Sequence, residues 1–137
     1  MIIDGKDAVL GRMATHAAKA ALSGEEVTVL NAKDLVIIGD KNAIVAKYVQ
    51  RMQVGTTSKG PFYPRTVIGI VKRAIRGMLK RKSVRGMDAL RRIRVYDDVP
   101  VEFNNKPKEA VHKVRTDRPV HKVTIGELSS ILKNRPA

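Results

Sequence analysis

The sequence predicts an α/β fold, because strand-like runs of apolar residues alternate with segments of helical periodicity. The strand-like runs occupy residues 1–4, 26–32, 35–38 and 94–100. With 137 residues the chain is long enough for one domain with its own core, and its 43% hydrophobic content argues against disorder. We therefore expect a single domain over residues 1–137, with an extended C-terminal segment at 101–137.

The first half of the chain is expected to alternate strands and helices. A helix is predicted from Leu10 onward, with an alanine-rich inner stripe and Gly24 at its end. The strands at 26–32 and 35–38 are so close in sequence that they suggest a hairpin, since a parallel crossover usually needs about a dozen residues. A second helix is predicted over residues 41–52.

The positive charge of the chain is concentrated in its middle third. Residues 47–94 contain fourteen Lys or Arg and a single acidic residue, Asp88, whereas the flanking segments are close to neutral. A helix predicted over residues 65–82 carries much of this charge on one side. Its apolar face holds Val67, Ile68, Val71, Ala74, Ile75, Met78 and Leu79. Its opposite face holds Gly69, Lys72, Arg73, Arg76, Gly77 and Lys80.

Two glycines on the basic face need a reason, because each costs about 1 kcal/mol relative to alanine inside a helix. Gly69 and Gly77 would let a phosphate backbone approach the helix closely. The alternative is that they allow a helix kink or close packing against another helix.

The loop and the C-terminal half complete the prediction. Residues 53–64, rich in glycine, proline and hydroxyl residues, form either a solvated connector or an arm that carries Lys59, Phe62 and Tyr63 to a partner. Residues 102–123 are expected to be irregular, and a capping box at 124–127 opens a final helix. A shorter helix at 85–93 is expected to point Met87, Leu90 and Ile93 inward and Arg91, Arg92 and Arg94 outward.

No catalytic, metal-binding or cofactor site is predicted. His16, His112 and His121 are far apart in sequence, without carboxylates at metal-ligand spacing, and the chain has no cysteine. Asp97 and Asp98 are interpreted as turn residues near basic neighbours. The glycine motifs that hold nucleotide phosphates are missing, which leaves little support for a Rossmann-type site.

The basic face instead favours a polyanionic partner. A face that is merely soluble usually mixes charges of both signs, whereas Lys72, Arg76 and Lys80 repeat like charges at every turn. Nucleic acid is favoured over a membrane, and the spread of basic residues over helix and loop favours folded RNA over DNA. The predicted RNA-binding residues are Lys59, Arg65, Gly69, Lys72, Arg73, Arg76, Gly77, Lys80, Arg81, Lys82, Arg85, Arg91 and Arg92.

Four motifs resemble those of one family. They are L-G-R-M-A-T-x-x-A-K at 10–19, V-L-N-A-K-D-L-V-I-I-G at 29–39, G-P-F-Y-P-R-T-V-I-G-I-V-K-R-A-I-R-G-M-L at 60–79 and V-Y-D-D-V-P at 95–100. In this order they span about the whole chain and closely resemble the family of the thirteenth large-subunit ribosomal protein. The short connection between Leu22 and Glu26 and the segment beyond Pro100 resemble its archaeal and eukaryotic branch, and the length of the chain favours the archaeal type.

The resemblance implies a three-layer α/β/α fold with a four-stranded, mostly parallel sheet, which would overrule the hairpin. It also implies a cytoplasmic, non-enzymatic ribosomal protein that binds large-subunit ribosomal RNA beside neighbouring ribosomal proteins and acts early in subunit assembly. From the residues themselves no membrane span is expected, since no apolar run approaches about 18 residues, and no cofactor or small-molecule substrate is expected either. Two alternatives stay open on the residues alone: a nucleotide-dependent RNA-modifying enzyme and a DNA-binding regulator.

Overall fold

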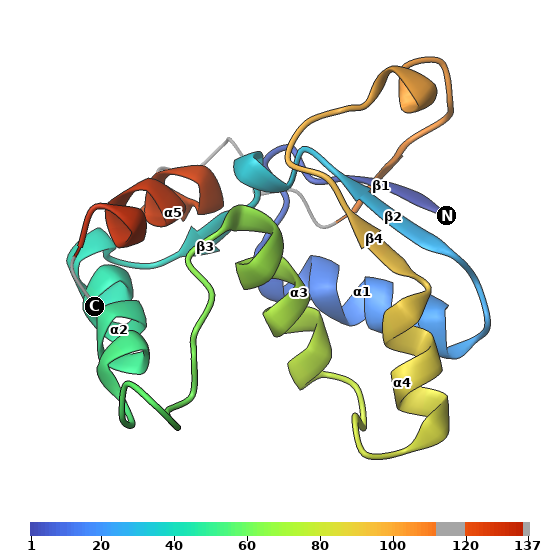
Figure 1. The fold of residues 1–137 in the computed structure, drawn as a ribbon. Coiled ribbons are helices and arrows are strands. Elements are labelled where there is room, and N and C mark those ends of the chain that lie inside the picture. Colours follow the sequence, from blue (N-terminus) through green and yellow to red (C-terminus); the bar gives the residue numbers. More distant parts are fainter. Residues whose placement is uncertain (112–119, 136–137) are drawn as a thin grey trace.

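Four parallel strands form the main sheet of the protein, which lies at the upper right in Figure 1. The structure is a computed structural model that describes residues 1–111 and 120–135. The sheet has the order β4-β2-β1-β5 and every neighbouring pair in it is parallel. Its strands are β1 (Ile2–Asp4), β2 (Val27–Leu30), β4 (Ile93–Val95) and β5 (Glu109–Ala110). The predicted α/β fold with a four-stranded parallel sheet is therefore confirmed.

The hairpin expected between residues 26–32 and 35–38 is wrong. Strand β3 (Val36–Ile38) pairs antiparallel with β6 (Lys122–Thr124) in a separate two-stranded sheet. The cause lies between the strands, where Asn31 adopts a left-handed conformation with φ of 53° and a 3₁₀ turn, η1 (Ala32–Asp34), follows it. These residues turn the chain out of the parallel sheet, so residues 35–38 are not one of its four strands.

Three helices pack together beside the sheet. Helix α1 (Leu10–Leu22) contacts both α3 (Val67–Gly77) and α4 (Val84–Arg91). The alanine-rich stripe predicted for α1 is buried, with Ala14 and Ala17 fully inaccessible. Because alanine has only a methyl side chain, α3 can lie close to α1, and the buried face of α3 fixes its basic face toward solvent.

The two remaining helices, α2 (Lys41–Gln53) and α5 (Ile125–Lys133), pack on each other (Figure 1). Thr124 caps α5, since its Oγ1 accepts a hydrogen bond of 3.2 Å from the amide of Glu127, as the capping box predicted. The carboxylate of Glu127 pairs with Lys41 at the start of α2. The same contact therefore joins the beginnings of both helices.

The helix predicted over residues 65–82 is shorter than expected and is rotated about its axis. It ends at Gly77, and Ile70 rather than Ile68 is buried, with relative accessibilities of 1% and 36%. Met78, expected inside, is 43% exposed. The reason lies in the tertiary structure, because α3 contacts α1, η1 and α5. Residues distant in sequence therefore decide which side of the helix is buried.

The segment after α3 also differs in detail from the prediction. Helix α4 covers 84–91 rather than 85–93, and Met87 is 41% exposed instead of inward. Strand β4 is confined to 93–95. The segment at 102–123, predicted to be irregular, includes β5 and the start of β6, and a 3₁₀ turn, η2 (Val101–Phe103), overlaps its beginning. Residues 112–119, which include His112, lie outside the described residues.

Candidate nucleic-acid interface

Three basic side chains of α3 line one hollow in the surface. Thr66 starts the helix by accepting a hydrogen bond of 3.2 Å from the amide of Gly69. One helical turn later, Lys72, Arg73 and Arg76 project from the side opposite the buried Ile70 and Val71. The hollow has a volume of about 350 Å³ and is lined by Pro64, Gly69, Lys72, Arg73, Arg76 and Leu90. We call this hollow the basic groove.

An aromatic cluster fixes the position of Arg73. Its guanidinium lies 4.9 Å from the centroid of the Tyr63 ring, a cation–π distance. Tyr63 packs edge-on against Tyr48 at 5.7 Å, and the Nη1 of Arg51 donates a hydrogen bond of 3.3 Å to its hydroxyl. Sequence reasoning missed this cluster, because it joins α2, the loop after it and α3. The only hint was Tyr63 in a loop between basic helices.

A second basic hollow lies at the turn between α3 and α4. It has a volume of about 540 Å³ and is lined by Lys80, Arg81, Lys82 and Met87. The turn is tightly built, since Ser83 caps α4 and a methyl group added at Gly86 would collide with the carbonyl of Lys80. The structure therefore holds these three cations close together on a fixed turn.

Three arginines of the predicted set donate hydrogen bonds to backbone carbonyls. Arg85 and Arg92 bond the carbonyls of Leu22 and Ala21, at 3.3 and 3.2 Å, at the C-terminal end of α1. Helix ends of this kind carry unpaired carbonyls and partial negative charge, which cations stabilise. Arg65 donates to the carbonyl of Arg135 at 3.1 Å. These guanidinium groups thus have roles inside the protein.

The two remaining cations of the predicted set are exposed. Arg91 lies on the outer side of α4 and pairs with Asp88 at 3.4 Å. Lys59 lies on the loop between α2 and α3. Six cations of the predicted set therefore line the two hollows, three in each, and the other five line neither: Lys59, Arg65, Arg85, Arg91 and Arg92.

The two glycines of α3 have different surroundings. A β-carbon at Gly69 would lie 2.6 Å from the Cβ of Pro64 and 2.8 Å from the Oγ1 of Thr66, so internal packing explains this glycine. A β-carbon at Gly77 would have no atom within 4 Å, and Gly77 is exposed. Packing within the protein therefore does not explain why glycine occupies position 77.

The segment of the chain that forms most of the basic groove carries only positively charged side chains. Between Lys41 and Met87 the chain contains no acidic residue. Acidic residues elsewhere pair with local cations, as in Lys33 with Asp98, and this hydrogen bond raises the pKa of Lys33. Burial raises the pKa of Tyr48, and the neighbouring Arg51 opposes this shift. Repulsion among the cations of α3 is thus left for an external anion to relieve.

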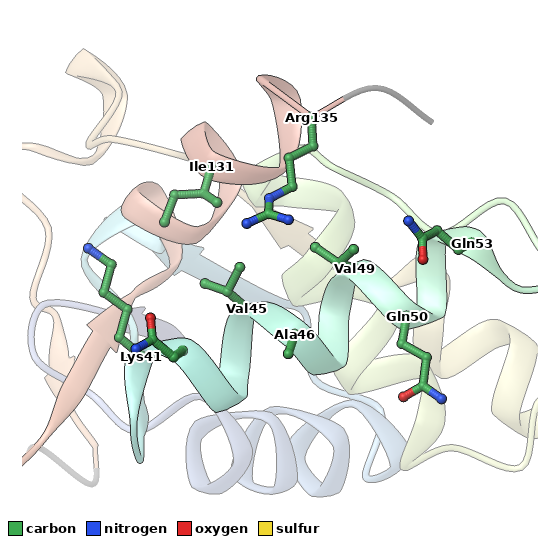
Figure 2. A pocket seen from close by; sticks show the side chains of 9 residues that line it. Lys41, Val45, Ala46, Val49, Gln50, Gln53, Ile131 and Arg135 are labelled. Carbon is green, nitrogen blue, oxygen red and sulfur yellow. The ribbon is translucent and has the colours of Figure 1, made fainter.

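Figure 2 shows another groove, of about 550 Å³, between α2 and α5. Val45 and Val49 face it from α2 and Ile131 from α5, and Arg135 reaches toward α2 from the end of α5. None of the predicted RNA-binding residues lines it. This groove is therefore separate from the predicted interface.

Two further points concern the part of the chain that the structure describes: groups of metal ligands and helices that could span a membrane. Within residues 1–111 and 120–135, no three His, Asp or Glu side chains are grouped so that they could hold a metal ion. Across the same ranges, no helix has both the length and the apolar character that a membrane span requires.

Comparison of the sequence with known proteins identifies the family to which this chain belongs. The family model for ribosomal protein L13 matches residues 1–102. The chain is 42% identical to the large ribosomal subunit protein uL13 of Thermoplasma volcanium, over 96% of each chain. It is 43% identical to uL13 of Methanopyrus kandleri, over 96% of this chain and 85% of that protein. It is 39% identical to uL13 of Haloarcula marismortui, over 96% of this chain and 90% of that protein.

These relatives are archaeal, which confirms the branch that the motifs indicated. They are named as large ribosomal subunit proteins, which agrees with the expected ribosomal protein and not with the nucleotide-dependent enzyme. The match includes every residue of the basic groove. The chain belongs to the ribosomal protein L13 family of the large ribosomal subunit.

Proposed function

We propose that this protein binds large-subunit ribosomal RNA through the basic groove and supports early assembly of the subunit in the cytoplasm, beside neighbouring ribosomal proteins. One observation carries the proposal. Lys72, Arg73 and Arg76 line the same hollow, within a stretch that contains no acidic residue. Membership of the L13 family supports the choice of ribosomal RNA among polyanions.

The groove would act by neutralising phosphates that converge from different RNA segments. Arginine suits this task because its planar guanidinium can bond a phosphate through two N–H groups at once. The contact of Arg73 with Tyr63 orders that side chain before RNA arrives, which lowers the entropy lost on binding. RNA helices whose phosphates repel each other can then pack closely.

The proposed RNA-facing residues fall into a centre and a periphery. The centre is the basic groove with the turn that follows it, and comprises Lys72, Arg73, Arg76, Gly77, Lys80, Arg81 and Lys82. Lys59, on the loop between α2 and α3, and Arg91, on α4, form the periphery. Gly69, Arg65, Arg85 and Arg92 belong to the predicted set but also have the internal contacts described above.

Salt dependence of binding tests the proposal. If about six to eight phosphates are contacted, log K should fall with log[salt] at a slope of roughly −5 to −7. The double variant R73A/R76A should bind large-subunit ribosomal RNA more weakly and reduce the slope by about 2. The matched control K106A/K133A removes two exposed cations from other elements and should retain the wild-type slope.

Two results would contradict the proposal. A slope near zero would exclude phosphate contact as the source of affinity. Competition by duplex DNA as effective as that by structured RNA would favour a DNA-binding regulator instead. The thermal unfolding of R73A/R76A should stay close to that of the wild type, because neither side chain is buried.

A further inference from the structure

Phe62 presents its ring to solvent, beside the proposed RNA-binding surface. It is 72% exposed, the highest value among the aromatic residues. The chain has five aromatic residues, all in the described ranges, and the other four contact another ring or a cation. An aromatic ring of this size is normally covered, so its exposure in an aromatic-poor protein points to an external contact.

The ring borders a hollow of its own. The hollow has a volume of about 460 Å³, within the range of about 300–1,000 Å³ typical of small-molecule sites. Its lining combines apolar side chains and hydroxyl groups with one amide and one guanidinium and has no acidic residue: Met52, Gln53, Val54, Gly55, Thr56, Thr57, Pro61, Phe62, Tyr63 and Arg65. These are groups that can contact the face and the polar edge of a planar ligand.

The loop that forms this hollow is an ordered turn. The amide of Gly60 donates a hydrogen bond of 2.8 Å to the carbonyl of Thr56, and the amide of Lys59 donates one of 3.2 Å to its Oγ1. Gly55 has a positive φ of 90°, and a β-carbon there would lie 2.5 Å from the Cδ of Pro61. The two arms of the loop are thus packed on each other, which holds the backbone next to Phe62.

Tyr63 connects the hollow to the basic groove. Its ring lines the hollow, and the same ring lies under the guanidinium of Arg73, which lines the groove. An RNA strand whose phosphates occupy the groove would therefore pass close to the hollow. Unpaired RNA bases stack on exposed aromatic side chains, whereas paired bases keep their faces covered.

We propose that the hollow beside Phe62 binds one unpaired base of the ribosomal RNA, stacked on the phenyl ring. This inference rests on the proposed function, and it adds a base-binding site to a surface otherwise proposed to contact phosphates. Charge complementarity favours RNA over a protein segment as the occupant, since Lys59 lies on the same loop and no acid lines the hollow.

The test compares F62L, F62Y and the control V101A for binding to purified large-subunit ribosomal RNA. Leucine keeps an apolar side chain but removes the aromatic face, and tyrosine keeps that face. F62L should weaken binding by roughly 5- to 150-fold, as loss of one stacked base does, while F62Y and V101A bind as the wild type. The salt slope of F62L should equal the wild-type slope, because no phosphate contact is removed.

A second measurement identifies the base directly. Ultraviolet crosslinking of the wild-type complex, followed by mass spectrometry, should yield an adduct between Phe62 and one nucleotide, which chemical probing shows to be unpaired. F62L that binds RNA as the wild type, while R73A/R76A binds weakly, overturns this inference and leaves the proposed function intact. Wild-type binding by both variants overturns the two together.

A third outcome concerns a protein occupant. If F62L binds purified RNA normally but is incorporated poorly into the large subunit, the hollow contacts a neighbouring protein and the inference is wrong. Because Phe62 is mostly exposed, F62L should unfold at the wild-type temperature, which separates loss of binding from loss of folding.

Discussion

Arg92, at the end of α4, donates a hydrogen bond of 3.2 Å from its Nη1 to the carbonyl oxygen of Ala21 in α1. A cation from the basic segment therefore stabilises the C-terminal end of a helix more than seventy residues away in sequence. The Nη2 of Arg85 makes a similar contact, of 3.3 Å, to the carbonyl of Leu22. Some cations of this segment thus stabilise the fold, whereas others are exposed on the surface.

We expect R92A to lower the free energy of unfolding by about 1 kcal/mol, since it removes both a hydrogen bond and a favourable charge at a helix terminus. The matched control is R91A, whose side chain is 78% exposed and pairs only with Asp88. That variant should change stability by less than about 0.5 kcal/mol. Urea denaturation of both proteins measures the difference, and equal stabilities would show that the contact to Ala21 contributes nothing.

The glycines of α3 give a second prediction. G69A should lower the free energy of unfolding by about 1–3 kcal/mol, because its methyl group would press on Pro64 and Thr66. G77A should leave stability unchanged or raise it by up to about 1 kcal/mol, since the added methyl meets no atom and alanine favours the helix.

RNA binding then separates the two explanations for Gly77. If a phosphate backbone approaches the helix there, G77A should weaken binding to large-subunit ribosomal RNA although the protein is as stable as the wild type. Titration of labelled RNA with the folded variant measures this. Unchanged affinity would mean that Gly77 serves neither packing nor RNA approach.

The order of helices and the position of the basic surface could be predicted from the sequence. Helix α1 was predictable because its alanine stripe repeats with helical spacing and Gly24 follows it with a positive φ of 99°. The final helix was predictable because Thr124 and Glu127 are local signals. Such features depend on residues that are close in sequence, so they can be recognised without knowledge of the tertiary structure.

The partner of β3 could not be predicted in this way. Residues 36–38 pair with residues 122–124, and no local pattern encodes a partner so far away. The same limit applies to α3, where Ile70 is buried because η1 and α5 cover that flank. At the candidate site, the cluster of cations could be predicted from the sequence. The contacts of Arg85 and Arg92 with α1 could not, because they depend on the tertiary packing.

Ser129 gives a prediction about how α5 is attached. Its Oγ donates a hydrogen bond of 2.6 Å to the carbonyl of Arg65, and the residue is 2% exposed. S129A should lower the free energy of unfolding by about 1–2 kcal/mol, because the carbonyl loses its donor in a partly buried position. The control S130A removes an exposed hydroxyl that bonds the carbonyl of Gly126 within the same helix and should be nearly neutral.

Stability should fall at alkaline pH, in part because of Tyr48. Burial raises the pKa of this phenol above its ordinary value of 10.0, and the nearby Tyr63 adds to the shift. A group whose pKa is higher in the folded state contributes stability that is fully present below the unfolded pKa. That contribution is lost as pH rises through the folded pKa, since the unfolded chain releases the proton first. Lys33, whose pKa Asp98 raises, contributes in the same direction.

The variant Y48F removes the titrating group and keeps the ring in the core. Its free energy of unfolding should therefore decline less steeply than that of the wild type between about pH 9.5 and 11. Urea denaturation across this range gives both slopes, and K33M serves as a comparison that removes only the contribution of the lysine. If Y48F and the wild type decline in parallel, the phenol of Tyr48 ionises as readily in the folded protein as in the unfolded chain.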